Sequence, residues 1–214
     1  MDQKHPIYPL IFSRRDVRRF LPRPIPEQVL QRILTAAHHA PSVGFMQPWN
    51  FIVIRDREVR GRVKELFLRE NGKAAAHFRG KRRRLYEGLK LEGILEAPVN
   101  LCVTCDPSRL GPHVLGRSTI RRTDVYSTCC AVQNLWLAAR AEGIGVGWVS
   151  ILRNDSLKKI LGIPRGIIPV AYLCVGYPVE FMAQPELERA GWAARLPVER
   201  LVFADRWGRR AVPR

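Results

Sequence analysis

The stretch from Asp124 to Leu152 constrains the fold of this chain more than any other segment. Apolar residues recur at helical spacing from 125 to 139 and cover nearly the whole circumference of the expected helix, with Asp124 expected as its N-cap. Gly143 stands where a left-handed residue commonly ends a helix, and the uncharged, β-rich segment 144–151 follows. A helix and a strand that are both apolar on all sides must be covered, so the sequence predicts a layered core around this pair.

The remaining elements follow from periodicity and from proline and glycine. We expect helices at 6–20, from Pro26 to about Ala37, at 56–70 and at 156–161, and strands at 51–54, 99–105 and 167–177. No G-x-G-x-x-G follows a strand and no phosphate-binding loop of the P-loop type is present. The fold class expected is α+β, a three-layer α/β/α sandwich around a mixed sheet, in one domain over 1–214. The polar tail 180–214 is expected to wrap the body or a neighbour.

Composition narrows the function classes. The 214 residues contain no apolar run of the ~20 residues that a membrane span needs, and the first residues carry charge and proline where a signal peptide would be apolar. The five cysteines lie in apolar contexts, as expected of a cytoplasmic protein. Cys102 and Cys105 are three apart on a strand and so face opposite sides, which argues against a disulfide or a metal site. We therefore expect no metal.

The net charge of +17 raises the question of a nucleic-acid partner. Basic residues concentrate at 14–19, 81–84 and 206–210, yet no nucleic-acid-binding motif accompanies them. The run at 81–84 is more typical of a solvated helix face. Nucleic-acid binding is therefore kept only as a distant alternative.

Two segments carry residues suited to chemistry. The cluster RRDVRR at 14–19 offers several arginine forks to a phosphate, although cations that compensate a helix dipole would produce a similar cluster. Asp16 would weaken phosphate binding there, so it is either a tether or directed at something else. The loop 40–50 offers Ser42, Gln47 and Asn50 as neutral hydrogen-bonding groups for a flavin edge, and Phe45, Met46 and Trp49 for its face. The alternative is an aromatic loop that caps a core.

The segment 144–151 has two features beyond a plain core strand. Gly145 and Gly147 weaken a strand interior and mark a place where another backbone or a flat ligand comes close. Ser150 alternates onto the same face as Trp148. Both interpretations of the glycines stay open on spacing alone.

The order of these motifs resembles the FMN-binding nitroreductase superfamily: R-R-x-x-R at 14–18, A-P-S-x-x-x-x-Q-P-W-x-F at 40–51, a long core helix, and G-x-G-W-x-S at 145–150. Because Asp16 stands where ordinary nitroreductases tend to have a small hydroxyl residue, the chain is most similar to the flavin-fragmenting branch. The resemblance implies a homodimer with FMN at the subunit interface. It also implies a lid over the flavin at 71–96, which contains LKLEG.

The resemblance assigns residues to roles. Asp16 and Ser150 would be catalytic. The implied cofactor-binding residues are Arg14, Arg15, Val17, Arg18, Ser42, Met46, Asn50, Leu91 and Gly147, with the phosphate held by the arginines. Whether Arg18 or Arg19 is the third phosphate ligand stays open.

The implied activity is oxygen-dependent fragmentation of reduced FMN to 5,6-dimethylbenzimidazole, the lower ligand of cobalamin, and erythrose 4-phosphate. Dioxygen is the implied co-substrate, and a separate NAD(P)H-dependent flavin reductase would supply reduced FMN. The alternative within the superfamily is an NAD(P)H-dependent nitroreductase or flavin reductase that recycles its FMN.

Overall fold

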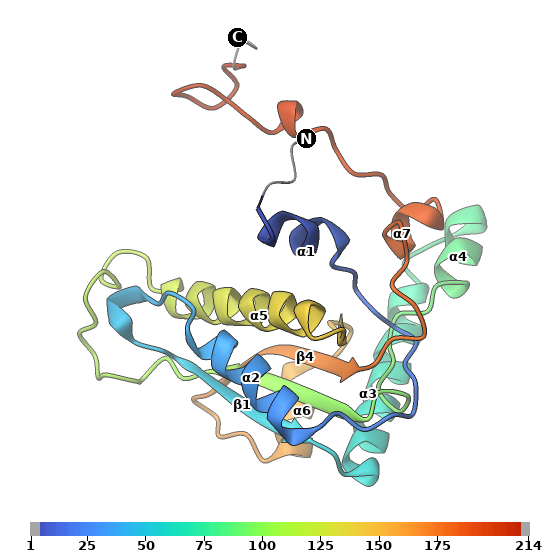
Figure 1. Cartoon of the computed structure of the whole chain (residues 1–214), viewed down its shortest axis with the longest axis horizontal. Coiled ribbons are helices and arrows are strands. Elements are labelled where there is room, and N and C mark those ends of the chain that lie inside the picture. The colour runs from blue at the N-terminus through green and yellow to red at the C-terminus, as the bar shows by residue number, and fades with distance from the viewer. Residues whose placement is uncertain (1–4, 211–214) are drawn as a thin grey trace.

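A four-stranded sheet forms the centre of the computed structural model, which describes residues 5–210 (Figure 1). The strands are β1 (Trp49–Ile54), β2 (Val99–Cys105), β3 (Gly145–Trp148) and β4 (Ile168–Gly176), and their spatial order is β1-β2-β4-β3. All three strand pairs are antiparallel. Among residues 5–210, the one parallel pairing is a bridge from Asp16 to Val146, outside the named strands. The predicted mixed sheet is thus antiparallel apart from that bridge.

Seven α-helices and two short 3-10 helices accompany the sheet within the described residues. They are α1 (Ile7–Ser13), α2 (Glu27–His38), α3 (Arg57–Ala75), α4 (Gly80–Glu87), α5 (Thr123–Ala141), α6 (Asn154–Leu161), α7 (Glu186–Arg189), η1 (Val43–Phe45) and η2 (Val198–Arg200). Helices α2 and α5 pack together against one face of the sheet, and α3 and α6 lie at the other. The predicted three-layer arrangement is confirmed.

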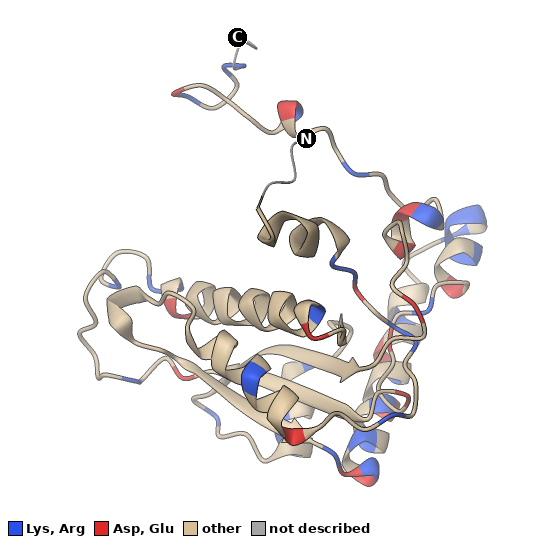
Figure 2. Ribbon diagram, viewed as in Figure 1, with Lys and Arg blue, Asp and Glu red and all other residues tan. Residues whose placement is uncertain are grey.

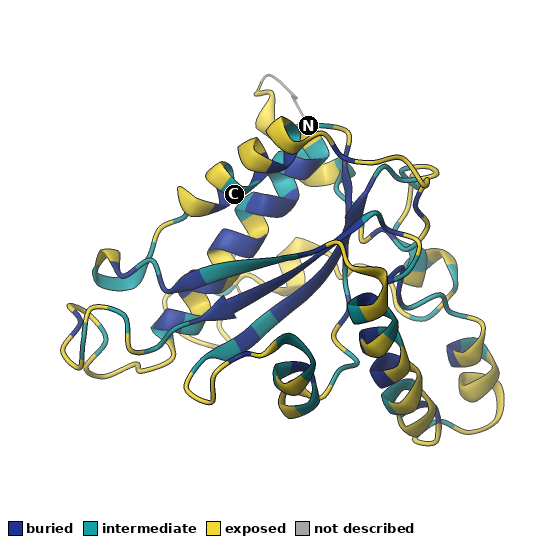
Figure 3. Cartoon of the chain, turned by 90° about the horizontal axis from the view of Figure 1, so that it is seen from below, coloured by how far each residue is buried: buried dark blue, intermediate teal, exposed yellow. Residues whose placement is uncertain are grey.

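Each face of the sheet contributes to its own apolar core, and Figure 3 shows the buried residues along the strands. Leu101 and Val103 of β2 point to the α2–α5 side, whereas Cys102 points to the α3–α6 side. This alternation is what a strand covered on both faces requires. Burial raises the pKa of the Cys102 and Cys174 thiols to about 12, so these thiols are packing groups rather than nucleophiles.

The central helix forms as predicted, but the strand expected over 144–151 is shorter, at Gly145–Trp148, so Ser150 lies beyond it, and the predicted N-cap also needs correction. Gly143 has the expected left-handed conformation, with φ of 70°. Asp124, however, is not the N-cap: that position belongs to Arg122. Asp124 lies within the first turn, is 3% exposed, and pairs with Arg117 at 2.5 Å. Its carboxylate anchors the connection 107–122 and also accepts a hydrogen bond from the Val125 amide, in the first turn, at 2.6 Å.

The prediction of a helix over 6–20 is wrong beyond Ser13. Residues 14–20 are extended, because their backbone groups bond to the sheet edge instead of to each other. The Val17 amide donates to the Val146 carbonyl at 2.9 Å, and the Leu21 amide donates to the Tyr177 carbonyl at 2.8 Å. The arginine cluster therefore begins at Arg14, the C-cap of α1, and continues along a strand-like segment beside β3.

The predicted lid, 71–96, and the tail from residue 180 differ in how they contact the rest of the domain. Residues 81–84 are exposed on α4, as expected of a solvated helix face, and Figure 2 shows charge concentrated on α3, α4 and the tail. Ile94 and Ala97 are fully buried, so the end of the predicted lid is anchored in the core. The tail packs on the body as far as Arg195, with Trp192 beside α4, and residues 196–210 then extend away from it (Figure 1). Among the helices of residues 5–210, none has the length and hydropathy that a membrane span requires.

Candidate functional site

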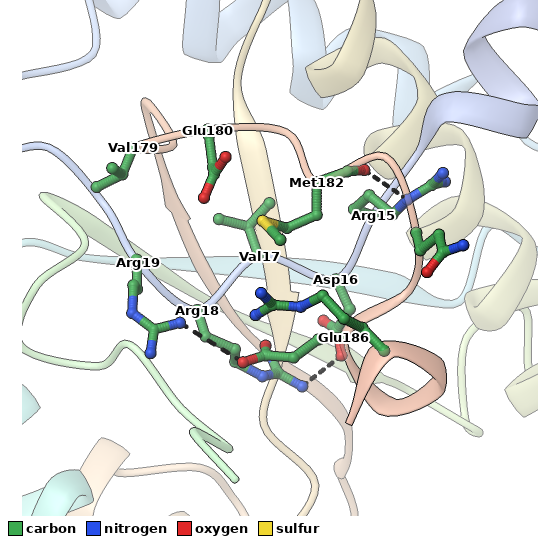
Figure 4. A pocket seen from close by; sticks show the side chains of 11 residues that line it. Arg15, Asp16, Val17, Arg18, Arg19, Val179, Glu180, Met182 and Glu186 are labelled. Atoms are coloured by element: carbon green, nitrogen blue, oxygen red, sulfur yellow. Dashed lines mark hydrogen bonds and ion pairs between the residues drawn. The ribbon is translucent and has the colours of Figure 1, made fainter. Parts of the chain in front are cut away.

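Asp16 lies on the extended segment 14–19 at the edge of β3 and is held there by two donors, of which Figure 4 shows Arg18. Its Oδ1 accepts a hydrogen bond from the Trp148 amide at 2.9 Å, and its Oδ2 is ion-paired with the Arg18 guanidinium. Desolvation by the surrounding protein raises the pKa of Asp16, although Arg18 and the Trp148 amide act in the opposite direction. The side chain is still 44% exposed, so a ligand can reach this carboxyl group.

The glycines of β3 are explained by this crossing segment. A Cβ at Gly147 would lie 2.0 Å from the Val17 carbonyl oxygen, and a Cβ at Gly145 would lie 2.9 Å from the Val17 side chain. Both distances are shorter than any ordinary contact. Of the two interpretations of these glycines, close approach of the segment at Val17 accounts for both, by its backbone at Gly147 and by its side chain at Gly145. The predicted contact of Gly147 with a flavin stays a prediction.

The four arginines of the cluster have different environments. Arg15 is a tether: its guanidinium donates to the main-chain carbonyls of Phe12, Arg14, Met182 and Ala183 and so ties the tail to α1. Arg14 stacks over the Trp136 ring, 4.8 Å from its centroid. Arg19 faces Glu186 of α7 at 3.5 Å. Arg18 is 11% exposed and turned toward Gly147, and its Nη1 has no hydrogen-bond partner among residues 5–210.

Two adjoining pockets of about 180 Å³ each share Arg15, Asp16 and Arg18 in their walls. The first is closed by the tail from Val179 to Arg189, as Figure 4 shows. The second is bounded by 89–91 on one side and by 185–187 with Arg195 on the other. Leu91, predicted to lie near the flavin, thus lines a pocket together with Asp16. The cationic side chains of the second pocket are Arg14, Arg15, Arg18, Lys90 and Arg195, against two carboxylates, Asp16 and Glu186.

Lys90, Glu186 and Arg195 were not among the residues singled out from the sequence. Lys90 stands within the LKLEG motif, which offered a signal. Glu186 and Arg195 lie in the irregular tail, about 170 residues or more from Asp16 in the sequence. Only the path of the tail brings them to the site.

The structure does not bring the loop 40–50 to Asp16. Ser42 and Asn50 lie at the β1 edge of the sheet, whereas Asp16 lies beyond β3, at the opposite edge. The Ser42 hydroxyl accepts from the Gln47 amide at 3.0 Å, and Met46 is 1% exposed, inside the core. With four strand spacings between Asn50 and Asp16, the separation is on the order of 19 Å.

Ser150 also lies apart from the Asp16 pockets. It follows β3, is exposed, and lines a pocket of about 210 Å³ with Asn154 and Tyr172. Ser150 is nevertheless only two residues beyond Trp148, whose amide donates to Asp16. Within residues 5–210, no group of His, Cys, Asp and Glu side chains is arranged to hold a metal ion.

The sequence matches the nitroreductase family over residues 11–177, a range that includes the Asp16 segment, the loop 40–50 and all four strands. The chain belongs to the nitroreductase family. It is 46% identical over 184 residues to a 5,6-dimethylbenzimidazole synthase of Rhodospirillum rubrum. The aligned region covers 86% of this chain and 87% of that protein. It is 39% identical to the enzyme of the same name from Rhodobacter capsulatus, over 87% of this chain and 90% of that protein.

Solved structures agree with this family assignment. A BluB-like flavoprotein from Clostridium difficile superposes with a TM-score of 0.70 at 20% identity, covering 94% of this chain and 100% of that one. An oxidised iodotyrosine deiodinase, solved with FMN and 3-iodo-L-tyrosine, has a TM-score of 0.70 at 25% identity, covering 83% and 92%. The similarity to the flavoprotein supports the fold. The similarity to the deiodinase is to a protein whose structure contains FMN.

Proposed function

We propose that this protein is an oxygen-dependent enzyme that fragments reduced FMN to 5,6-dimethylbenzimidazole and erythrose 4-phosphate. The observation that carries the proposal is the Asp16 carboxyl group, fixed between the Trp148 amide and Arg18 in the wall of two cationic pockets. These two bonds tether the segment, but a carboxylate also weakens the binding of a phosphate, so a role beyond holding a phosphate is favoured. Its placement is what proton transfer near a phosphate-bearing substrate requires. The similarity to two 5,6-dimethylbenzimidazole synthases supports the same reaction.

The residues present fit FMN. Arg14, Arg18, Lys90 and Arg195 surround the second pocket and suit a phosphate dianion. The buried Arg18 Nη1, which lacks a partner among residues 5–210, is a donor ready for such a ligand. Arg15 lies in the pocket wall, but its guanidinium already donates hydrogen bonds to main-chain carbonyls and so has few donors left for a phosphate. Leu91 offers apolar contact from the opposite wall.

A second copy of the chain would complete the site. Each pocket beside Asp16 is about 180 Å³, below the roughly 300–1,000 Å³ of pockets that enclose whole ligands. The other flavin contacts expected from the sequence, Ser42 and Asn50, lie at the far edge of the sheet. In a homodimer, the β1 edge of one copy can meet the Asp16 edge of its partner. The outer face of α5, where Tyr126, Cys129 and Cys130 are exposed, supports such an interface.

Reduced FMN supplies the electrons for dioxygen and the ring atoms of the benzimidazole product. Asp16 holds or accepts a proton, and its raised pKa keeps the carboxyl group closer to neutral than an exposed aspartate. The Trp148 amide and Arg18 fix its orientation. Segments 89–91 and 185–187 limit water at the pocket. Ser150 would donate a hydrogen bond to developing negative charge, from a position two residues beyond Trp148.

Reduced FMN would come from a separate NAD(P)H-dependent flavin reductase, since the sequence carries no dinucleotide-binding motif. The fate of the flavin separates this proposal from a conventional nitroreductase. We would supply the protein with FMN, a flavin reductase and excess NADPH in air, and follow flavin and NADPH together. Stoichiometric loss of FMN with appearance of 5,6-dimethylbenzimidazole is expected. Intact FMN after many NADPH oxidations that require this protein would contradict the proposal and favour a nitroreductase or flavin reductase.

A further inference from the structure

The loop that begins at Ser42 and runs into β1 is strained. Gly44, Phe45 and Gln47 all have positive φ values, of 53°, 53° and 49°. This left-handed region suits glycine but costs energy for Phe and Gln. Strain of this kind persists only where surrounding contacts hold it, and it concentrates at ligand-binding segments.

Arg109 provides such contacts. It lies in the turn after β2, and its Nη1 donates to the Gln47 carbonyl at 2.5 Å and to the Trp49 carbonyl at 3.0 Å. One guanidinium therefore binds the strained residue and the first residue of β1 at once. Arginine was not predicted to have a role here, because Arg109 is about 60 residues from the loop.

The same guanidinium orients the side chain of Asn50. Arg109 Nη2 donates to Asn50 Oδ1 at 2.5 Å, and Asn50 Nδ2 donates to the Thr104 hydroxyl at 3.2 Å. Since a guanidinium can only donate, the oxygen of the Asn50 amide must face Arg109. The second hydrogen of Nδ2 is left as the group that Asn50 can offer to a ligand.

We propose that Arg109 is a positioning residue for the half of the site formed by the loop 42–50. It holds the loop in its left-handed conformation and fixes the orientation of the Asn50 amide, so that the remaining N–H of Nδ2 is the donor presented to a ligand. The ligand atom that Asn50 meets is then an acceptor, such as a carbonyl oxygen or an unprotonated ring nitrogen of a planar heteroaromatic ring. This inference rests on the proposed function, in which that ring belongs to FMN.

The test compares Arg109→Met with Arg121→Met, a matched control that removes an exposed arginine from the same connection. Oxidised FMN is titrated with each protein, and the dissociation constant is taken from quenching of flavin fluorescence. We expect Arg109→Met to weaken FMN binding roughly tenfold, as the loss of a charge-assisted hydrogen bond implies, and to shift the visible absorption band of the bound flavin. Arg121→Met should bind FMN like the wild type.

Two further variants separate orientation from folding. Asn50→Asp keeps an acceptor for Arg109 but has no donor, so we expect an unchanged thermal midpoint with roughly tenfold weaker FMN binding. Gln47→Gly added to Arg109→Met removes the backbone strain, so it should recover thermal stability but not the affinity for FMN.

The outcomes that overturn the inference are distinct from failure of the proposed function. Equal FMN affinity and equal spectra for Arg109→Met and Arg121→Met would refute the positioning role while leaving flavin binding intact. Wild-type affinity in Asn50→Asp would refute the donor assignment. A wild-type protein that does not quench flavin fluorescence would overturn the proposed function and this inference together.

Discussion

Asp16 places a carboxylate within an arginine cluster, and its surroundings shift its pKa in opposite directions. Desolvation raises the pKa of Asp16, while Arg18 and the Trp148 amide lower it, and desolvation is the larger effect. The unusual position of an acidic residue could be recognised from the sequence. The Trp148 partner could not, because it depends on the parallel bridge between Asp16 and Val146.

The raised pKa leads to a prediction about stability. Because the pKa of Asp16 is raised on folding, the folded state binds its proton more tightly than the unfolded chain does. The contribution of Asp16 to the free energy of unfolding is therefore greatest below the unfolded pKa. It falls as pH rises through the folded pKa. Asp16→Asn should therefore be at least as stable as the wild type at pH 7, with the advantage shrinking toward pH 4. Urea midpoints at both pH values measure this.

The exposed Asp205, replaced by Asn, serves as the control and should show little pH-dependent difference. If Asp16→Asn were instead less stable than the wild type at pH 7 and the deficit disappeared at pH 4, attraction to Arg18 would outweigh desolvation.

Gly147 provides a second prediction at this scale. A Cβ there would meet the Val17 carbonyl at 2.0 Å, and backbone on both sides cannot move cheaply. We expect Gly147→Ala to lower the free energy of unfolding by about 3 kcal/mol. Gly72→Ala, within α3 and with nothing within 4 Å of the added Cβ, should instead stabilise by up to about 1 kcal/mol. Similar midpoints for the two variants in urea would contradict the crowding argument.

At the scale of helices and strands, hydrophobic periodicity predicts an element correctly where tertiary packing and local conformational propensity agree. Helices α2, α5 and α6 and strands β2 and β4 lie close to their predicted positions. The segment 14–20 departed from prediction because hydrogen bonds to a distant strand edge replaced helical ones, and a single sequence contains no direct signal of that pairing. The loop 40–50 could be identified as a candidate binding segment, but its support by Arg109 could not.

The connection 107–122 is held to α5 by an ion pair whose loss should be costly. Asp124 is 4% exposed at its side chain and Arg117 is 19% exposed. Arg117→Met would leave a buried carboxylate without its partner, so we expect a loss of about 3 kcal/mol in unfolding free energy. Adding Asp124→Asn should recover part of it. As a comparison, Arg32→Met removes an exposed pair with Glu142 and should cost much less; equal losses would refute the distinction.

At the scale of the whole molecule, the predicted cofactor contacts divide between two opposite edges of the sheet. A sequence-level resemblance can name these residues but cannot say which chain supplies each. Two further surfaces could be covered by a second copy: the extended residues 196–210, and the exposed apolar residues of α1, including Ile7, Tyr8 and Phe12.

Sedimentation equilibrium tests this directly. We expect a mass twice the 24.5 kDa of the chain at micromolar concentration. A 24.5 kDa species that binds FMN with full affinity would show that one chain forms the whole site, contrary to the proposed arrangement.

In the proposed reaction, Asp16 takes part in the conversion of reduced FMN to 5,6-dimethylbenzimidazole. The most direct measurement is a single turnover: wild type and Asp16→Asn are loaded with reduced FMN without oxygen, exposed to air, and their products separated by chromatography. We predict 5,6-dimethylbenzimidazole from the wild type, and intact oxidised FMN from an Asp16→Asn variant that still binds flavin. Recovery of intact FMN from the wild type, or equal yields of 5,6-dimethylbenzimidazole from both proteins, would contradict the claim.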